Sequence, residues 1–347
     1  MTKSTLYSTM QLIAEILDFN DNPEALSDRI KKTSVDWDTF VTVGSKHLML
    51  PALYCQLKAK RLLPLIPDDL TIYLEEIASI NRGRNEVLLA EAREISEIFN
   101  KEQINHVFIK GMALIAGHTF KDHAERMIGD IDILIAENQL NTAFDILTQH
   151  GYSDTVDSIL ERKRHRHLPR QISPEKFGAI ELHSDILTYK YKHLITSDKV
   201  LNNKRIIDGI ALPSLEDAIK TAVYAFQIND KAHLYGYFSF KTIYDCLALQ
   251  LLTQPSLLKQ LSEEKHSQSF LLISSVFFKG LKPWKSSLYS KLLKRYYTLS
   301  FQNSILGNLL HSLVKHLIFL HIRLLLVFKS QHYRSFILRN KTIIKNK

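Results

Sequence analysis

Apolar residues recur at helical spacing from the N-terminus to about Asn100. One stripe comprises Leu12, Ile13, Ile16 and Leu17, and another comprises Leu88, Leu89, Ala92, Ile95 and Phe99. Spacings of three and four residues place such side chains on one face of a helix. No strand pattern appears in this stretch, so residues 1–100 are predicted to form a helical region.

The hydrophobic period changes at Ile104. A short apolar run in NHVFIKGMAL ends in Lys-Gly and precedes a helix predicted over Met112–Phe120. A second apolar run, DIDILIA, begins at Asp130 and precedes a helix predicted over Asn138–His150 and stopped by Gly151. The local order is strand, helix, strand, helix.

Strand patterns continue to about residue 212, and helical patterns follow. AIELHSDI (Ala179–Ile186) is a third apolar run, NNKRIIDGIALP predicts a hairpin, and Ser214 with Asp217 resembles a capping box. The prediction is an α+β fold with a small mixed sheet. Its regions are 1–100, helical; 101–212, the mixed-sheet core; and 213–347, helical with a basic amphipathic tail.

Composition excludes general disorder and favours a helix-rich globular protein. The 347 residues are 45% hydrophobic and 23% charged, with only 11 Gly and 9 Pro. Two cysteines, Cys55 and Cys246, exclude a disulfide framework, so a reducing, cytoplasmic setting is expected. Glu15 and Asp18 interrupt any apolar signal-peptide core, so export is not expected.

The C-terminal tail carries the positive charge. The net charge is +9, yet no Asp or Glu follows Glu264, whereas fourteen of the 45 Lys and Arg lie in 266–347. The first 265 residues therefore carry 31 cations against 36 anions, a net charge of −5. Leu317–Phe328 is apolar, but its length and its His321 and Arg323 lead us to expect no transmembrane helix.

Leucines repeat at helical spacing within this tail, from Leu306 to Leu317, with polar residues between them. The favoured interpretation is a C-terminal helical layer with a solvated basic rim. The alternatives are contacts with an acidic partner, nucleic acid, or anionic lipid at the inner face of the membrane. Lipid is the best of these alternatives, because the cations accompany leucines rather than aromatic platforms.

A pair of acids in GDIDILI is the clearest candidate for chemistry. Strand alternation would send Asp130 and Asp132 to one face and the isoleucines to the other. Two adjacent anions favour a cation between them, and hard oxygen ligands favour Mg²⁺ or Mn²⁺. The alternative is a strand end that exposes two acids to solvent.

Two further segments support a metal site near a phosphate. Gly111 ends the first strand and opens a helix, so its backbone could approach a phosphate, and Lys110 adds positive charge. Glu181 supplies a third carboxylate, with His183 on the same strand face. Three carboxylates on neighbouring strands can hold two metals and orient a hydroxyl for in-line displacement at phosphorus.

These motifs, in this order, resemble the bacterial uncharacterised nucleotidyltransferase family of the DNA polymerase beta-like superfamily. The resemblance covers roughly residues 100–250 and rests on Phe108-Ile109-Lys110-Gly111, Arg126, Gly129-Asp130-Ile131-Asp132, His167-Leu168-Pro169 and Ile180-Glu181-Leu182-His183. It implies a polymerase beta-like core that binds a nucleoside triphosphate, with ATP expected, and Mg²⁺ or Mn²⁺. It also implies that Asp130 and Asp132 are metal ligands and that Glu181 is the third carboxylate and candidate base.

The nucleotide-binding residues are expected to be Lys110, Gly111, Arg126, Gly129 and His167. Arg suits bidentate binding of an oxyanion, although a structural salt bridge is the alternative for Arg126. His165 and His167, interleaved with Arg164 and Arg166, could lie over the triphosphate, or they could belong to a solvated basic strand edge. Lys110-Gly111 replaces the Gly-Ser of many relatives.

Lys241 and Asp245 resemble a basic-residue-to-Asp helix of the family, or they form a surface ion pair between positions i and i+4.

Two functions follow as hypotheses. The first is transfer of a nucleoside monophosphate, with AMP as the example, from a triphosphate to a hydroxyl on a small molecule, a protein or an RNA end. The second is a non-catalytic module that senses nucleotide on a nucleotidyltransferase-like fold and docks to a membrane or a partner through its basic C-terminal helices.

Overall fold

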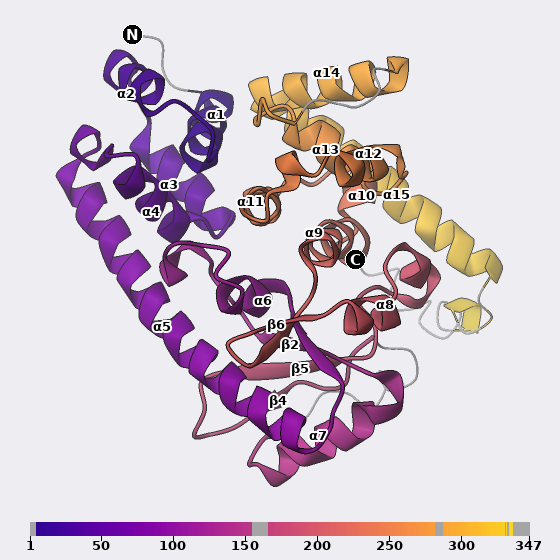
Figure 1. The fold of residues 1–347 in the computed structure, drawn as a ribbon. Helices are drawn as coiled ribbons and strands as arrows, with labels where there is room; N and C mark the ends of the chain where they lie inside the picture. The colour runs from indigo at the N-terminus through magenta and orange to yellow at the C-terminus, as the bar shows by residue number, and fades with distance from the viewer. Residues whose placement is uncertain (1–4, 155–165, 282–286, 330, 332, 336–347) are drawn as a thin grey trace.

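Figure 1 shows the fold in a computed structural model, which describes residues 5–154, 166–281, 287–329, 331 and 333–335. Helices dominate these residues and surround a small sheet. The helices are α1 (Leu6–Leu17), α2 (Pro23–Lys32), α3 (Trp37–Lys46), α4 (Leu50–Ala59), α5 (Asp68–Lys101), α6 (Lys110–Ala116), α7 (Leu140–Gln149), α8 (Ser197–Asn202), α9 (Leu215–Tyr224), α10 (Ala232–Tyr235), α11 (Phe240–Ala248), α12 (Pro255–Glu263), α13 (Gln268–Ser274), α14 (Leu288–Gln302) and α15 (Ser304–Lys329). The strands are β1 (His106–Ile109), β2 (Ile131–Ile135), β3 (Ser153–Asp154), β4 (Gln171–Ile172), β5 (Ala179–His183), β6 (Arg205–Ile207) and β7 (Ile210–Leu212).

Five strands form a mixed sheet in the order β1-β2-β5-β4-β3. β2 pairs in parallel with β5, whereas the other neighbours pair antiparallel. Every residue of β2 is buried, as expected for a central strand covered on both faces. The predicted α+β class with a small mixed sheet is therefore confirmed.

The local predictions are also confirmed in the main. The order strand, helix, strand, helix appears as β1, α6, β2 and α7, and the hairpin appears as β6 and β7. Ser214 caps α9, since its hydroxyl accepts a 3.1 Å hydrogen bond from the Asp217 N–H, but the Asp217 carboxylate accepts from the Ser214 hydroxyl rather than from its N–H, so the capping box is only half formed. The sequence did not predict β3 or β4, because a strand of two residues shows no alternation. Arg164 and His165 lie outside the described residues.

One apolar core crosses all three predicted regions. It runs from Met10 in α1, through Ile133 in β2, to Leu281 after α13. The predicted boundaries near residues 100 and 212 coincide with changes of secondary structure, but the core continues across both. The helical regions and the sheet therefore share their interior.

α15 differs from the prediction for the tail. It is a single helix of 26 residues, and Gly307 is the one residue of it that is buried among those whose side chains are described. Its segment Ile305–Phe328 has a mean hydropathy of 1.6 and is, by length and composition, long and apolar enough to cross a membrane. The prediction of a buried helical layer is wrong for α15. The length argument against a spanning segment is also wrong, because Leu317–Phe328 continues a longer helix.

Candidate active site

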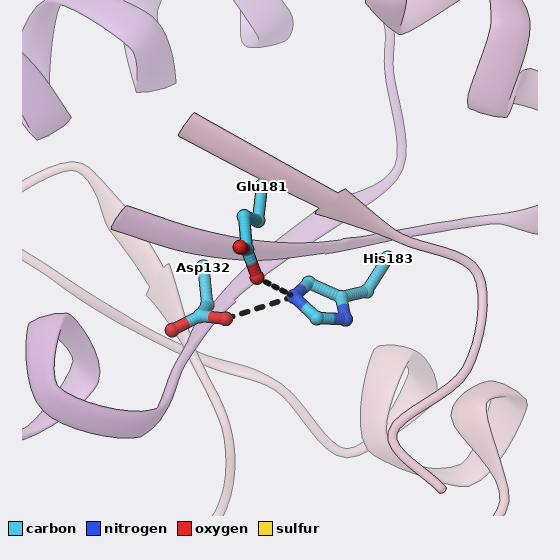
Figure 2. A group of neighbouring side chains, drawn as sticks. All are labelled: Asp132, Glu181 and His183. Atoms are coloured by element: carbon cyan, nitrogen blue, oxygen red, sulfur yellow. Dashed lines mark hydrogen bonds and ion pairs between the residues drawn. The ribbon is translucent and has the colours of Figure 1, made fainter. Parts of the chain in front are cut away.

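Acidic side chains from two neighbouring strands meet at one face of the sheet (Figure 2). Asp132 in β2 and Glu181 in β5 are direct partners in the parallel register, so strand alternation sends both to the same face. His183 joins them, and one ligand atom from each of the three residues lies within 4.8 Å of the others. The structure therefore brings Asp132 and Glu181 together, as the sequence predicted.

Asp130 lies beside this group but just outside β2, which begins at Ile131. Arg170 connects Asp130 to the group. Its Nη2 atom lies 2.9 Å from Oδ2 of Asp130 and 3.1 Å from Oε1 of Glu181. All three predicted carboxylates thus surround one site, although Asp130 reaches it from the loop before the strand.

Hydrogen bonds and charges keep two of these carboxylates ionised. Burial opposes ionisation of Asp132, but the 2.8 Å hydrogen bond from His183 Nε2 and the charge of Lys110 outweigh it, so the pKa of Asp132 lies below its usual value. The His183 contact also holds the pKa of Glu181 far below its usual range, with help from Arg170 and against burial. At Asp130 burial prevails and raises the pKa, although Arg170 opposes it. Asp132 and Glu181 are therefore held in the form that binds a cation.

The donor set fits a hard divalent cation. Carboxylate oxygens are the ligands that Mg²⁺ and Mn²⁺ prefer. His183 can orient both carboxylates or supply a nitrogen ligand, and its Nδ1 atom is buried with no hydrogen-bond partner among the described residues. Lys110 forms an ion pair with Asp132, and Arg170 pairs with Asp130 and Glu181, so two cations lie directly against the acids.

The middle of α5 fixes the loop that leads into β2. Asn85 Nδ2 donates to the carbonyl oxygens of His123 and Arg126, both at 2.7 Å. Asn81 Nδ2 donates to the Ala124 carbonyl, also at 2.7 Å. Because both amides come from a rigid helix, they set the position at which β2 begins and hence the position of Asp132.

The same helix fixes the start of β5. The Glu91 carboxylate accepts hydrogen bonds from the Gly178 N–H at 2.7 Å and from the Tyr152 hydroxyl at 2.8 Å. A Cβ atom on Gly178 would lie 2.7 Å from Glu91 Oε2 and 2.8 Å from Ile131 Cδ1, so a larger residue would have to displace these side-chain ends. α5 therefore positions both strands that carry the acids.

The turn from β1 into α6 comes one residue earlier than predicted. β1 ends at Ile109, and α6 opens at Lys110, whose backbone is left-handed with φ 56°. Gly111 is buried, and a Cβ atom there would lie 3.2 Å from Ile128 Cγ1, so the close approach that it allows is to a side chain. Gly129 is exposed, and its carbonyl accepts a 3.1 Å hydrogen bond from Arg84. The nucleotide contacts of Gly111 and Gly129 stay predictions.

Arg126 forms a buried ion pair with Asp245 of α11. Its Nε and Nη2 atoms lie 2.7 and 2.9 Å from the two carboxylate oxygens, a bidentate geometry. This is the structural salt bridge that the sequence left open for Arg126. Of the two alternatives for Lys241 and Asp245, the surface ion pair is wrong, because Asp245 is buried and directed at Arg126.

A cavity opens beside the acids, between α6, α9 and α11. Lys110, Arg126, Arg166 and Lys241 line it together with Asp230 and Asp245, so four cations and two carboxylates face the same space and cations prevail. The Thr221 hydroxyl and Asn229 Oδ1 also belong to lining residues, are buried, and have no hydrogen-bond partner among the described residues. Lys110 lines the cavity and pairs with Asp132, so it joins the basic cavity to the acidic group.

His167 lies next to the acids without contacting the cavity. It forms an isolated bridge with His183, and the two rings are 5.1 Å apart between centroids. Burial lowers the pKa of His167, although a hydrogen bond to the Leu168 carbonyl opposes this. Its predicted nucleotide contact stays a prediction.

The sequence did not single out Arg170 or Thr221. Arg170 belongs to the basic run Arg162–Arg170, but its partner Asp130 lies forty residues earlier, and no spacing rule connects them. Thr221 lies within α9, where a threonine on a helix gives no local sign of a ligand. Asn229 and Arg166 also line the cavity. They come from separate segments, so local sequence gave no sign that they would meet there.

Comparison with known proteins agrees with this geometry. A family model described as uncharacterised nucleotidyltransferase matches residues 33–252, which is more than half of the chain and includes the acids and the cavity. No curated protein matches the sequence.

Proposed function

Since the chain belongs to the uncharacterised nucleotidyltransferase family, we propose that it transfers a nucleoside monophosphate from a triphosphate to a hydroxyl acceptor in a metal-dependent reaction. ATP is the proposed donor, so that AMP is transferred. The acceptor hydroxyl gives its proton to a base, for which Glu181 is the proposed residue, and its oxygen bonds to the α-phosphorus. The bond from the α-phosphorus to the oxygen that bridges to the β-phosphate breaks, which releases pyrophosphate. A small molecule, a protein or an RNA end can offer such a hydroxyl.

One observation carries this proposal: an acidic group and a basic cavity are contiguous at Lys110. Asp130, Asp132 and Glu181 would hold Mg²⁺ or Mn²⁺, which supplies Lewis-acid stabilisation of the phosphoryl oxygens when bound. Phosphate oxygens entering the cavity would meet Lys110, Arg166 and Lys241, and Thr221 could donate its unused hydroxyl. A cavity in which cations outnumber carboxylates, next to a group of acids, suits a metal-bound triphosphate.

The charge pairs also suggest how the site changes when it is loaded. Lys110 and Arg170 contact the acids directly, in the positions where a cation would compete with them. A metal at the acids would weaken both pairs and free these side chains for phosphate oxygens. Lys110 would move less than Arg170 to reach a phosphate, because Lys110 already lines the cavity.

The test measures metal binding and turnover separately. Wild-type protein should bind Mn²⁺ in calorimetric titration and release pyrophosphate from ATP in the presence of Mg²⁺ and a hydroxyl donor. Asp132→Asn should lose Mn²⁺ binding and lower pyrophosphate release about 10³-fold, since a metal ligand supplies several kcal/mol to the transition state. Asp28→Asn, on the exposed face of α2, is the matched control. Equal Mn²⁺ binding by wild type and Asp132→Asn would contradict the metal assignment.

A second candidate is a non-catalytic nucleotide sensor. It is favoured by the two cations that already neutralise the carboxylates, because such a site can bind nucleotide through its basic cavity without a metal. ATP binding that is indifferent to Mg²⁺ and to Asp132→Asn, but is lost in Lys241→Gln, would identify the sensor.

A further inference from the structure

α15 presents a long apolar face to solvent. Six side chains recur every three or four residues and therefore lie along one side of the helix. They are Leu309, Leu313, Leu317, Leu320, Leu324 and Phe328, with exposed fractions of 64%, 57%, 57%, 55%, 58% and 76%. A contiguous apolar stripe of this length marks an interaction surface rather than an ordinary solvated helix.

A different side of α15 faces the body of the protein. Gly307 is buried, and His311 and Val314 line a cavity that Tyr235 and Tyr297 also line. α15 contacts α14 and α10 there, and Figure 1 shows the rest of the helix extending along the outer edge of the molecule. The leucine stripe therefore stays free while the helix is attached to the fold.

The charge on α15 has one sign. The helix contains no Asp or Glu, and none follows Glu264 in the chain. Lys315 lies opposite the leucine stripe, on the side of Asn308, whereas Arg323 lies at the edge of the stripe. The neighbouring α14 adds Lys291, Lys294 and Arg295. Phe319, Leu325 and Leu326 are exposed outside the stripe, so the apolar surface of α15 is wide. The result is a broad apolar surface with cations of one sign, on a helix long enough to lie across many lipid headgroups.

We propose that α15 binds the surface of a bilayer that contains anionic phospholipid and lies in the plane of that surface. The leucine stripe enters the boundary between headgroups and acyl chains, and Lys315 and Arg323 contact lipid phosphates. A spanning orientation is disfavoured, because Lys315 lies near the middle of Ile305–Phe328 and the first turns contact α14 and α10. Pairing with a second α15 would bring like charges together without an acid to balance them.

Vesicle sedimentation of the full chain tests this proposal. Wild-type protein should pellet with phosphatidylcholine vesicles that contain about 30 per cent phosphatidylserine and bind pure phosphatidylcholine more weakly. Leu313→Gln/Leu317→Gln/Leu320→Gln should abolish pelleting. The matched control changes three exposed apolar residues of α5, Ile72→Gln/Ile80→Gln/Val87→Gln, and should keep it. Lys315→Gln/Arg323→Gln should lower the partition coefficient about 30-fold, at about fivefold for each cation.

Four outcomes would overturn the proposal. The first is the absence of pelleting with anionic vesicles, and the second is equal pelleting of wild type and the leucine variant. The third is resistance of the bound protein to extraction at alkaline pH, which indicates a spanning helix. The fourth is a concentration-dependent dimer that the leucine variant loses while vesicle binding is absent, which indicates a second copy. None of these readouts depends on nucleotide turnover, so the result is independent of the proposed transferase activity.

Discussion

Two roles are open to Arg126, a phosphate contact and a structural salt bridge. A lone arginine before the acid pair suits phosphate binding, but the structure pairs it with Asp245, 119 positions later. Both side chains are buried, so each neutralises a charge that would otherwise be costly in the interior. Arg126 still lines the basic cavity, yet its Nε and Nη2 atoms are already used.

Breaking this pair should destabilise the protein strongly. Asp245→Asn leaves the Arg126 charge buried without its partner, and we expect a loss of about 3–5 kcal/mol in the free energy of unfolding. Urea denaturation followed by circular dichroism measures it. The double variant Arg126→Met/Asp245→Leu removes both charges and should recover most of the loss. If the double variant were as unstable as Asp245→Asn, the pair would owe its effect to packing instead.

His47 gives a prediction for pH. Its ring lies 5.0 Å from the Phe240 ring and 5.8 Å from Phe238 between centroids, and burial lowers its pKa to about 4, helped by Lys46. The unfolded chain takes up this proton near pH 6.5. The free energy of unfolding should therefore be unaffected above pH 6.5 and fall as pH drops towards 4, by about 3 kcal/mol for this residue.

Denaturation midpoints at pH 7, 5.5 and 4.5 check this prediction. His47→Phe carries no proton, so its stability should depend less on pH than that of the wild type. The same replacement at the exposed His193 is the control and should keep the wild-type slope. Parallel slopes for wild type and His47→Phe would contradict the assignment to His47.

At this scale the sequence predicts residues whose partners follow a local rule. Asp132 and Glu181 could be predicted, because each lies on a short strand with a recognisable alternation. Arg170 and Asp245 could not, since their partners come from segments forty or more residues away and charge alone does not select among many candidates. The left-handed backbone of Lys110 could not be predicted either, because glycine is the residue that usually adopts this conformation and Gly111 is adjacent.

Among the elements, α5 does the most to build the site. Its 34 residues span about 50 Å, and its polar side chains reach the entrance of β2 and the start of β5. Asn85 is fully buried and joins two backbone carbonyls of the loop before β2. A buried amide with two such acceptors is a rigid support for the residues that follow the loop.

Asn85→Ala should therefore weaken both stability and activity. Two buried carbonyls lose their donor, so we expect a loss of about 2–3 kcal/mol in the free energy of unfolding. Because β2 then loses its fixed entrance, pyrophosphate release and Mn²⁺ affinity should fall as well. Asn100→Ala, at an exposed position of the same helix, should leave all three unchanged. A destabilised Asn85→Ala with normal Mn²⁺ affinity would show that the loop is held by other contacts.

The helices and long strands were predictable as elements because their apolar periods are local properties of the chain. The environment of an element was less predictable, and α15 is the clearest example. Its leucines have the spacing of a helix that packs on a core, and the sequence favoured that interpretation. Periodicity fixes which side of a helix is apolar, but not which surface covers it.

For the whole molecule, the main feature is a buried network that joins the three regions. Gln56 in α4 donates to Glu125, before β2, at 3.1 Å and to the Tyr244 hydroxyl in α11 at 2.9 Å. The Tyr244 hydroxyl in turn donates to Glu125. Burial raises the pKa of Tyr244, with Glu125 adding to the effect, so the hydroxyl keeps its proton. The network lies within the common core. Neither the network nor the shared core could be predicted from the sequence pattern of a single region.

We therefore expect the three regions to unfold together. Trp37 in α3 reports on the N-terminal helices when Trp284 is replaced by Phe, and far-ultraviolet circular dichroism reports on all helices. In urea, both signals should change at the same midpoint, as in a two-state transition. Tyr244→Phe removes a hydroxyl that bonds across two regions, so it should lower the free energy of unfolding by about 1–3 kcal/mol and shift both midpoints equally. Separate midpoints, or a shift in only one signal, would mean that the N-terminal helices form an independent unit despite the shared core.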